Sequence, residues 1–256
     1  MLKDDRVVES KFLDLSQLDS LRYIEESDGQ VHIGARATFG DCIRSRVLQR
    51  TARVILDAIE TIASPQIRNL GTVAGNLGNA SPAGDSIPPL FVLGSKVVLE
   101  NSSGKREVPI EAFFIGYRKT VRRNDELIRE VCFPPVSKND ITFFKKLGLR
   151  HANAISVASV AFWAKPKGDR IAHARIALGA VAPTVIRATK SEANLTGAQL
   201  TTEKAKNIAK MCADESRPIS DIRGSASYRR RAIEALTYMG LVEVAERFHL
   251  KQALSF

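Results

Sequence analysis

Cysteine, aromatic residues and long apolar runs are scarce in this chain of 256 residues, and each scarcity excludes a class of protein. The three cysteines, Cys42, Cys132 and Cys212, lie far apart in the sequence. An odd and unclustered count argues against a disulfide framework and against an iron–sulfur or zinc site on this chain. We therefore expect a protein of the cytoplasm, where thiols stay reduced.

Membrane-spanning and secretory signals are missing as well. No run comes near the roughly 20 apolar residues that cross a bilayer, and residues 1–6 are charged where a signal peptide would be apolar. The four histidines are isolated from one another and from cysteine, so neither a metal-ligand spacing nor a Cys–His pair is present. We expect no membrane span, no metal site and no catalytic side chain.

Basic residues are abundant instead, and they give a formal net charge of +10. Such a charge suits a nucleic-acid-binding protein, but the arginines are dispersed. One group falls on an early predicted helix (Arg44, Arg46, Arg50, Arg53) and another on a late one (Arg229, Arg230, Arg231). Aromatic residues make up only 6%, too few for base-stacking platforms. The pattern favours a solvated or subunit-facing basic surface and no nucleic-acid partner.

The stretch 62–85 is rich in small residues and nearly free of charge. Four glycines punctuate it (Gly71, Gly75, Gly78, Gly84), and no lysine or arginine lies between Arg68 and Lys96. Small residues let the backbone approach a ligand, and successive N–H groups can form an anion site. Asp85, the sole charged residue of that interval, suits a sugar or ribityl hydroxyl better than a phosphate. The alternative is a tight structural loop in which Asp85 or Ser86 caps a short helix.

Apolar periodicity predicts an α+β fold. In the first half we expect short strands at 11–15, 21–24 and 31–35, one amphipathic helix from 47 to 62 that Pro65 ends, a helix at 88–93, a hairpin at 96–100 and 106–110, and a strand at 127–133. The segment 134–140 is the predicted domain boundary. After it we expect a three-stranded antiparallel sheet (142–147, 156–165, 170–178) with a three-helix bundle (188–195, 203–212, 228–247).

The order of residues in three segments resembles a known family. Arg-Asn-Leu-Gly-Thr-Val-Ala-Gly-Asn at 68–76, followed by Ala-Ser-Pro-Ala-Gly-Asp at 80–85, resembles a flavin-binding loop of the molybdenum hydroxylases. The relatives in question are the FAD-binding subunits of xanthine dehydrogenase and of aerobic carbon monoxide dehydrogenase. Segments 113–120 with 125–128, and 221–230, resemble later parts of the same subunits, in the same order.

This resemblance implies a division of the chain. Residues 15–136 would form the second FAD-binding subdomain of the molybdopterin dehydrogenase type, and residues 137–256 the C-terminal domain of the carbon monoxide dehydrogenase flavoprotein type. Residues 1–14 would be a remnant of an N-terminal FAD subdomain, which is apparently truncated. In the family that subdomain carries a first Ala-Gly-Gly loop that also holds the FAD diphosphate, and this sequence has no such motif.

The resemblance also implies which residues bind FAD. Thr72, Gly75 and Asn76 would contact the diphosphate through backbone amides and short side chains, and Asp85 the ribityl or adenosine part. Others implied are Ile62, Asn79, Tyr117, Arg118, Ile128 and Lys146. Core packing is the alternative for Ile62 and Ile128, and an ordinary surface turn is the alternative for the 117–118 pair. Only one of Lys145 and Lys146 can point inward; we favour Lys146, whose charge would favour an anionic reduced flavin.

The function implied is that of an oxidoreductase subunit that is not active alone. A molybdopterin-binding large subunit would oxidise the substrate, a [2Fe–2S] small subunit would carry the electrons, and FAD on this chain would pass them to NAD+ or another acceptor. The complex would be a dimer of heterotrimers. The alternative is a non-catalytic scaffold subunit with weak or absent FAD binding. The reason for this alternative is the missing first loop. Each charge-assisted hydrogen bond that such a loop would make to the FAD diphosphate is worth roughly 1.5–3 kcal/mol.

Overall fold

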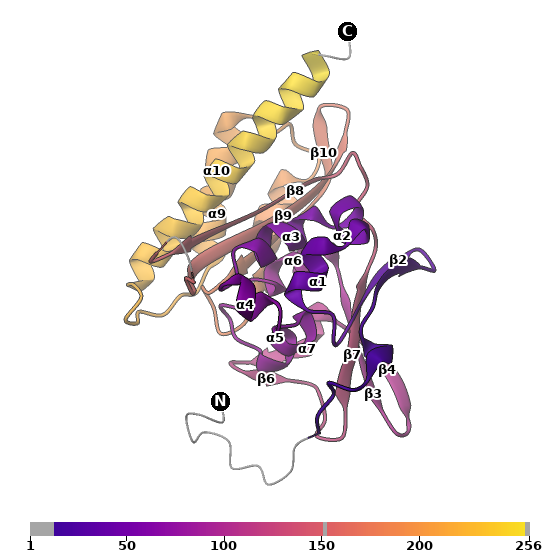
Figure 1. The fold of residues 1–256 in the computed structure, drawn as a ribbon. Coiled ribbons are helices and arrows are strands. Elements are labelled where there is room, and N and C mark those ends of the chain that lie inside the picture. Colours follow the sequence, from indigo (N-terminus) through magenta and orange to yellow (C-terminus); the bar gives the residue numbers. More distant parts are fainter. Residues whose placement is uncertain (1–12, 151–152, 254–256) are drawn as a thin grey trace.

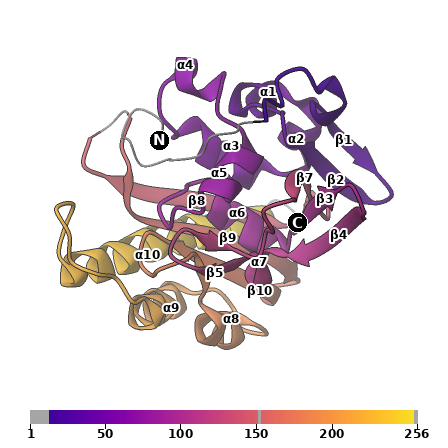
Figure 2. The same cartoon turned by 90° about the horizontal axis from the view of Figure 1, so that it is seen from below.

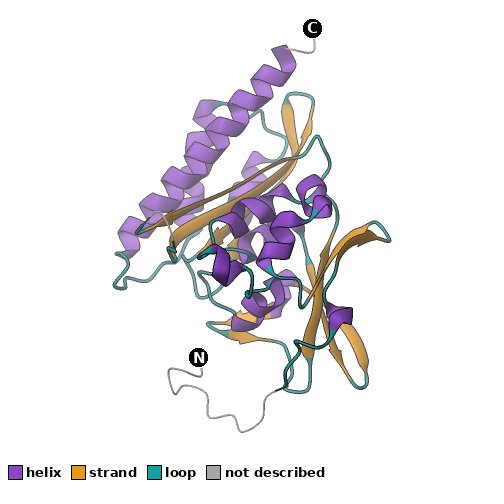
Figure 3. Cartoon of the chain, viewed as in Figure 1, coloured by secondary structure: helices purple, strands orange, loops and turns teal. Residues whose placement is uncertain are grey.

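The computed structural model describes residues 13–150 and 153–253, with side chains up to residue 246. Figure 1 shows two sheets with a group of short helices between them and a long C-terminal helix on the outside. Seen from below, the helices α8, α9 and α10 lie on one side of the second sheet and the short helices on its other side (Figure 2). The α+β fold class is therefore confirmed (Figure 3).

The first sheet has five antiparallel strands in the order β1-β2-β7-β3-β4. Their bounds are β1 Ile24–Ser27, β2 Gln30–Gly34, β3 Lys96–Asn101, β4 Gly104–Pro109 and β7 Leu127–Phe133. The predicted hairpin and the strand at 127–133 are thus present. The strand predicted at 21–24 begins only at Ile24, because a 3-10 turn occupies Asp19–Leu21. Of the strand predicted at 11–15, residues 13–15 form no strand and the rest lies outside the described residues.

The described part of this half also has seven short helices: α1 Phe39–Arg44, α2 Arg46–Thr51, α3 Arg53–Glu60, α4 Pro65–Arg68, α5 Val73–Asn79, α6 Ile87–Leu93 and α7 Ile110–Phe113. The single helix predicted for 47–62 is wrong, since Ala52 adopts an extended φ of −155° and separates α2 from α3. Pro65 does not end a helix but opens α4, and the Ser64 side chain caps this helix by accepting from Ile67 N–H. The small-residue stretch is thus helical over much of its length.

The second sheet is antiparallel in the order β11-β10-β9-β8. It consists of β8 Ile141–Gly148, β9 Ser156–Lys167, β10 Arg170–Gly179 and β11 Ile186–Arg187. The three predicted strands are present, but the sheet has four, because the two residues of β11 pair with the end of β10. A strand this short carries no periodicity that a sequence could show.

Three helices pack on one face of the second sheet: α8 Thr189–Leu195, α9 Thr202–Glu215 and α10 Ala226–Ala253. They form a layer with α9 between α8 and α10, while α3 and α6 pack on the opposite face of the sheet. Strand β9 is consequently buried on both faces, and its residues 156–162 are all buried. No described helix is long and apolar enough to cross a membrane.

The two halves of the chain share a hydrophobic core. Its first cluster includes residues of α3 and α6 together with Phe144, Ala161 and Ala177 from the second sheet. A second cluster fills the space between that sheet and α8–α10. The junction of the two halves is therefore a packed interface, and the cavities described next lie along it.

Candidate functional site

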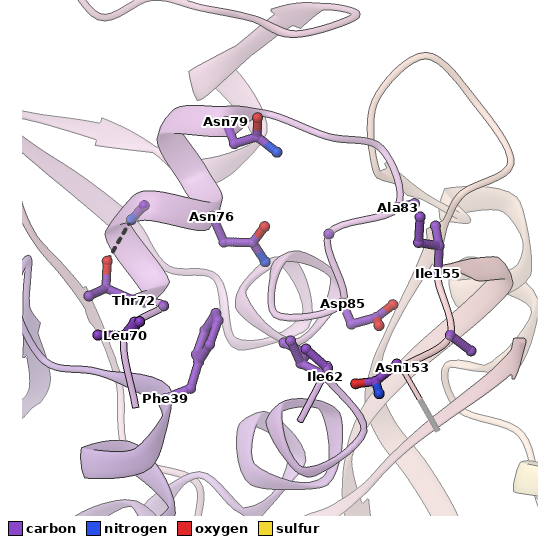
Figure 4. A pocket seen from close by; sticks show the side chains of 15 residues that line it. Phe39, Ile62, Leu70, Thr72, Asn76, Asn79, Ala83, Asp85, Asn153 and Ile155 are labelled. Carbon is purple, nitrogen blue, oxygen red and sulfur yellow. Dashed lines mark hydrogen bonds between the residues drawn. The ribbon is translucent and has the colours of Figure 1, made fainter. Parts of the chain in front are cut away.

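A cavity of about 490 Å³ lies at this junction. Six of the ten residues predicted to bind FAD line it: Ile62, Thr72, Gly75, Asn76, Asn79 and Asp85. In Figure 4 the α5 side chains stand on one side, and Asp85, Asn153 and Ile155 lie across from them. We call this space the flavin cavity.

Several lining residues were missed by the sequence analysis, namely Phe39, Leu70, Asn153, Ala154 and Ile155. Phe39 follows the helix cap Thr38, and the 153–155 segment follows the predicted strand that carries Lys146. The only sequence feature that could have indicated these residues as cavity lining is their position next to a segment that resembles the family. No sequence period connects residues that lie so far apart in the chain.

Two glycines of the stretch, Gly71 and Gly84, serve close packing. None of Gly71, Gly75, Gly78 and Gly84 has a positive φ. A Cβ added at Gly71 would stand 3.1 Å from the Phe39 ring. One added at Gly84 would stand 2.9 Å from Ile87 Cδ1 and 3.0 Å from Asn76 Oδ1. Small size, and not left-handed backbone, is what this stretch requires.

Helix α5 uses some of the donors that the resemblance assigned to the diphosphate. Thr72 caps the helix, and its Oγ1 accepts from Gly75 N–H at 2.9 Å. Asn76 N–H donates to Thr72 O at 3.0 Å, and Asn76 Nδ2 donates to Ser86 Oγ at 2.8 Å. Asn79 is exposed, and its side chain has no hydrogen-bond partner among the described residues. The donors left for a ligand include the Thr72 hydroxyl and the Asn79 amide.

Asp85 lies buried in an ion pair at the junction. Lys146 Nζ donates to Asp85 Oδ2 at 2.8 Å, and Ser156 Oγ donates to Oδ1. Burial raises the pKa of the Asp85 carboxyl, while Lys146 and Ser156 oppose that shift. Neither Asp85 nor Ser86 caps α6 with its side chain, so the capping alternative is not what the structure shows.

Strand β8 separates the two candidate lysines. Lys146 points toward Asp85, whereas Lys145 Nζ pairs with Glu243 of α10 at 2.7 Å on the opposite face of the sheet. This is the alternation that a strand imposes. The cation beside the flavin cavity is therefore Lys146.

A second cavity of about 390 Å³ adjoins the first and shares Ala83 and Ile155 with it. Tyr117 and Arg118 line it from the turn between β5 (Phe114–Gly116) and β6 (Lys119–Thr120). Three more arginines contribute to its lining: Arg217, Arg223 and Arg229. We call this space the arginine cavity.

Arg229 is buried, whereas the sequence analysis expected it on a solvated or subunit-facing surface. Its residue is only 4% exposed, and its guanidinium donates to Val157 O at 3.1 Å, to Ala180 O at 2.8 Å and to Asp221 Oδ1. Its Nε is buried with no partner in the described structure. A buried donor of this kind is costly to leave unpaired.

Ile128 lines neither cavity. It is buried on β7, behind α5, where its Cδ1 lies near Gly78. Its described role is packing under the helix that forms one wall of the flavin cavity. Within the described residues, no three His, Cys, Asp or Glu side chains gather as a metal site.

Comparison with known proteins gives the family. The model of the FAD binding domain in molybdopterin dehydrogenase matches residues 1–136, and that of the CO dehydrogenase flavoprotein C-terminal domain matches residues 142–244. The glyceraldehyde dehydrogenase medium chain of Sulfolobus acidocaldarius is 34% identical over 91% of this chain and 82% of its own length. The xanthine dehydrogenase FAD-binding subunit of Escherichia coli O157:H7 is 30% identical over 88% of this chain and 78% of its own length.

The fold agrees. A solved carbon monoxide dehydrogenase from Hydrogenophaga pseudoflava matches with a TM-score of 0.85 at 30% identity, over 88% of this chain and 78% of that chain. Fold and cavities thus define a flavin-binding subunit of an oxidoreductase. The chain belongs to the family of FAD-binding domains of molybdopterin dehydrogenases, joined to the C-terminal domain of the CO dehydrogenase flavoproteins. The resemblance drawn from the sequence is confirmed.

The residues present fit FAD. The flavin cavity has a size typical of cofactor sites, and small residues bring its backbone close. Among the described residues that line it, Asp85 is the only charged one. Hydroxyl and amide groups, together with a carboxylate for sugar hydroxyls, make up the donor and acceptor set. When bound, FAD supplies the electron-transfer chemistry. The chain itself supplies position and electrostatics.

Proposed function

We propose that this chain is the electron-transfer subunit of a multi-subunit molybdenum hydroxylase. Its FAD takes electrons from the [2Fe–2S] clusters of a partner subunit and passes them to NAD+ or another acceptor. The observation that carries this proposal is the pair of adjoining cavities, which meet at Ala83 and Ile155. One cavity suits the flavin, and the other opens directly beside it.

Ten residues take part in FAD binding in this proposal. Six line the flavin cavity: Ile62, Thr72, Gly75, Asn76, Asn79 and Asp85. Ile128 supports α5 from behind, and Lys146 acts through Asp85. Tyr117 and Arg118 line the neighbouring arginine cavity, where they control access of the electron acceptor. The division at 15–136 and 137–256 belongs to the same proposal.

The arginine cavity supports a dinucleotide acceptor. Arg217 is exposed, and no described side chain pairs with it; Arg118 stacks its guanidinium 5.9 Å above the Tyr117 ring. Arginine is the preferred residue for phosphate recognition. NAD+ brings a diphosphate and two rings, so it matches both the charge and the apolar parts of this cavity.

The partners follow from the relatives, several of which are named as medium chains or FAD-binding subunits. We propose a molybdopterin-binding large subunit and a [2Fe–2S] small subunit, assembled as a dimer of heterotrimers in the cytoplasm. All three cysteines are free and buried, which suits a reducing compartment.

A visible absorption titration with FAD tests the proposal, on the chain together with its partner subunits. We expect saturation at one equivalent. Asn79→Ala should weaken binding about fivefold, as one lost hydrogen bond of about 1 kcal/mol implies, without lowering the melting temperature. Gly78→Ala, one residue away and outside the cavity, serves as the control. A complex that binds no FAD would contradict the proposal and favour the scaffold alternative.

A further inference from the structure

The ammonium group of Lys146 is fully engaged by the protein. Its side chain is 11% exposed, and Nζ donates to Asp85 Oδ2 at 2.8 Å, to Thr61 O at 2.9 Å and to Ala154 O at 3.2 Å. An ammonium has three N–H donors. Each of the three therefore has a protein acceptor, and none remains for a ligand.

The three acceptors belong to three different segments of the flavin cavity. Thr61 precedes the lining residue Ile62, and Asp85 and Ala154 themselves line the cavity. Figure 4 shows Ile62, Asp85 and Asn153 around the same space. Ser156 adds a second link, because its hydroxyl donates to Asp85. Lys146 thus joins segments from both halves of the chain.

We propose that Lys146 is a positioning residue that holds three segments of the flavin cavity lining together through Asp85, Thr61 and Ala154, and does not itself contact the flavin. Loss of Lys146 therefore weakens the binding of oxidised FAD and of reduced FAD by the same factor. This inference rests on the proposed FAD binding, and it assigns Lys146 a different task from that of a cation at the flavin edge.

The two tasks differ in what they stabilise. A free ammonium would attract the anionic reduced flavin more than the neutral oxidised one. Lys146 is already paired with a carboxylate at 2.8 Å, so the pair presents little net charge to the cavity. Its loss should therefore act through geometry and weaken both forms alike.

The matched test compares Lys146→Met with Lys145→Met. Both variants remove one charge from neighbouring positions of β8, but Lys145 pairs with the exposed Glu243 on the other face of the sheet. We expect Lys146→Met to raise the Kd of oxidised FAD tenfold or more, and that of dithionite-reduced FAD by the same factor. Lys145→Met should stay within twofold of wild type for both forms.

Two further variants separate geometry from charge. Lys146→Gln retains N–H donors without the charge and should recover part of the lost affinity. Lys146→Met combined with Asp85→Asn leaves no unpaired buried carboxylate, which protects folding if the single variant fails. A Lys146→Met protein that loses affinity for reduced FAD alone, or for neither form, would overturn the proposal.

A readout without FAD keeps the inference separate from the proposed function. Amide hydrogen exchange in segments 61–63 and 153–157 should be faster in Lys146→Met than in Lys145→Met, in the FAD-free protein. If the wild type binds no FAD, the proposed function fails, and this comparison still decides whether Lys146 holds the three lining segments together. Equal exchange in the two variants would contradict it.

Discussion

At the residue scale, Glu126 orders the segment that follows the Tyr117–Arg118 turn. Arg106 donates to its carboxylate through Nε at 2.6 Å and Nη2 at 2.8 Å, and Arg123 N–H donates at 2.7 Å. These hydrogen bonds, that of Arg106 first, lower the pKa of Glu126 to about 2. Arg106 also donates to Val121 O, so the whole segment 121–126 depends on this carboxylate.

The lowered pKa of Glu126 predicts a pH dependence of stability. A carboxyl whose folded pKa is depressed contributes stability above its unfolded pKa, and that contribution is lost as pH falls through the folded value. We expect Glu126→Gln to be less stable than wild type at pH 7 and the gap to close between about pH 4.5 and pH 2. Urea unfolding across this range measures it. Asp19→Asn, at an exposed carboxylate, controls for net charge; a gap that stays constant would contradict the assignment.

The sequence showed Asp85 but not its partners. Asp85 is noticeable because it is the sole charge in a long interval, and a strand's alternation limits the cation to one of two lysines. Lys146 contacts Thr61 and Ala154, and Asp85 contacts Ser156. These residues are up to 95 positions apart in the chain, from Thr61 to Ser156. Only the folded chain places them side by side, so their roles had no signal in the sequence.

At the element scale, the strands were easier to predict than the short helices. Strand β7 begins and ends where its apolar pattern does, at Leu127 and Phe133. Helix α5 was missed because its small residues give no apolar period, and α4 was missed because its four residues are too few to show one. Their caps were the available signals: Ser64 before Pro65, and Thr72, whose side chain accepts from the third residue of its helix.

Two glycines of the small-residue stretch should respond in opposite ways to alanine. At Gly84 a methyl group would meet Ile87, Asn76 and the Ser81 carbonyl within 3.1 Å, and such overpacking costs about 1–3 kcal/mol. At Gly78, inside α5, the nearest atom is Ile128 Cδ1 at 3.6 Å, and alanine should add up to about 1 kcal/mol through helix propensity. Urea unfolding of the two variants measures both. A Gly84→Ala protein as stable as wild type would show that the stretch is not close-packed.

At the scale of the whole molecule, the order of domains could be predicted and their interface could not. Three family segments in the right order indicated the architecture from residue types alone. The shared core depends on alanines such as Ala161 and Ala177, which are fully buried between α6 and the second sheet. The net charge was equally uninformative, because Arg44, Arg50 and Arg53 are each paired with a carboxylate in the fold.

The shared core predicts that the two halves unfold together. Trp163, the single tryptophan, lies on β9 against the first core cluster, with its Nε1 3.0 Å from Asp140 Oδ2 and Arg175 over its ring. Its fluorescence therefore reports the junction, while far-UV circular dichroism reports all helices and strands. We expect one urea transition with the same midpoint for both probes. Since FAD binds at the junction, FAD at 100 times its Kd should shift both curves together, by about 2.7 kcal/mol. Separate transitions would mean that each half folds alone and that the cavity walls meet only loosely.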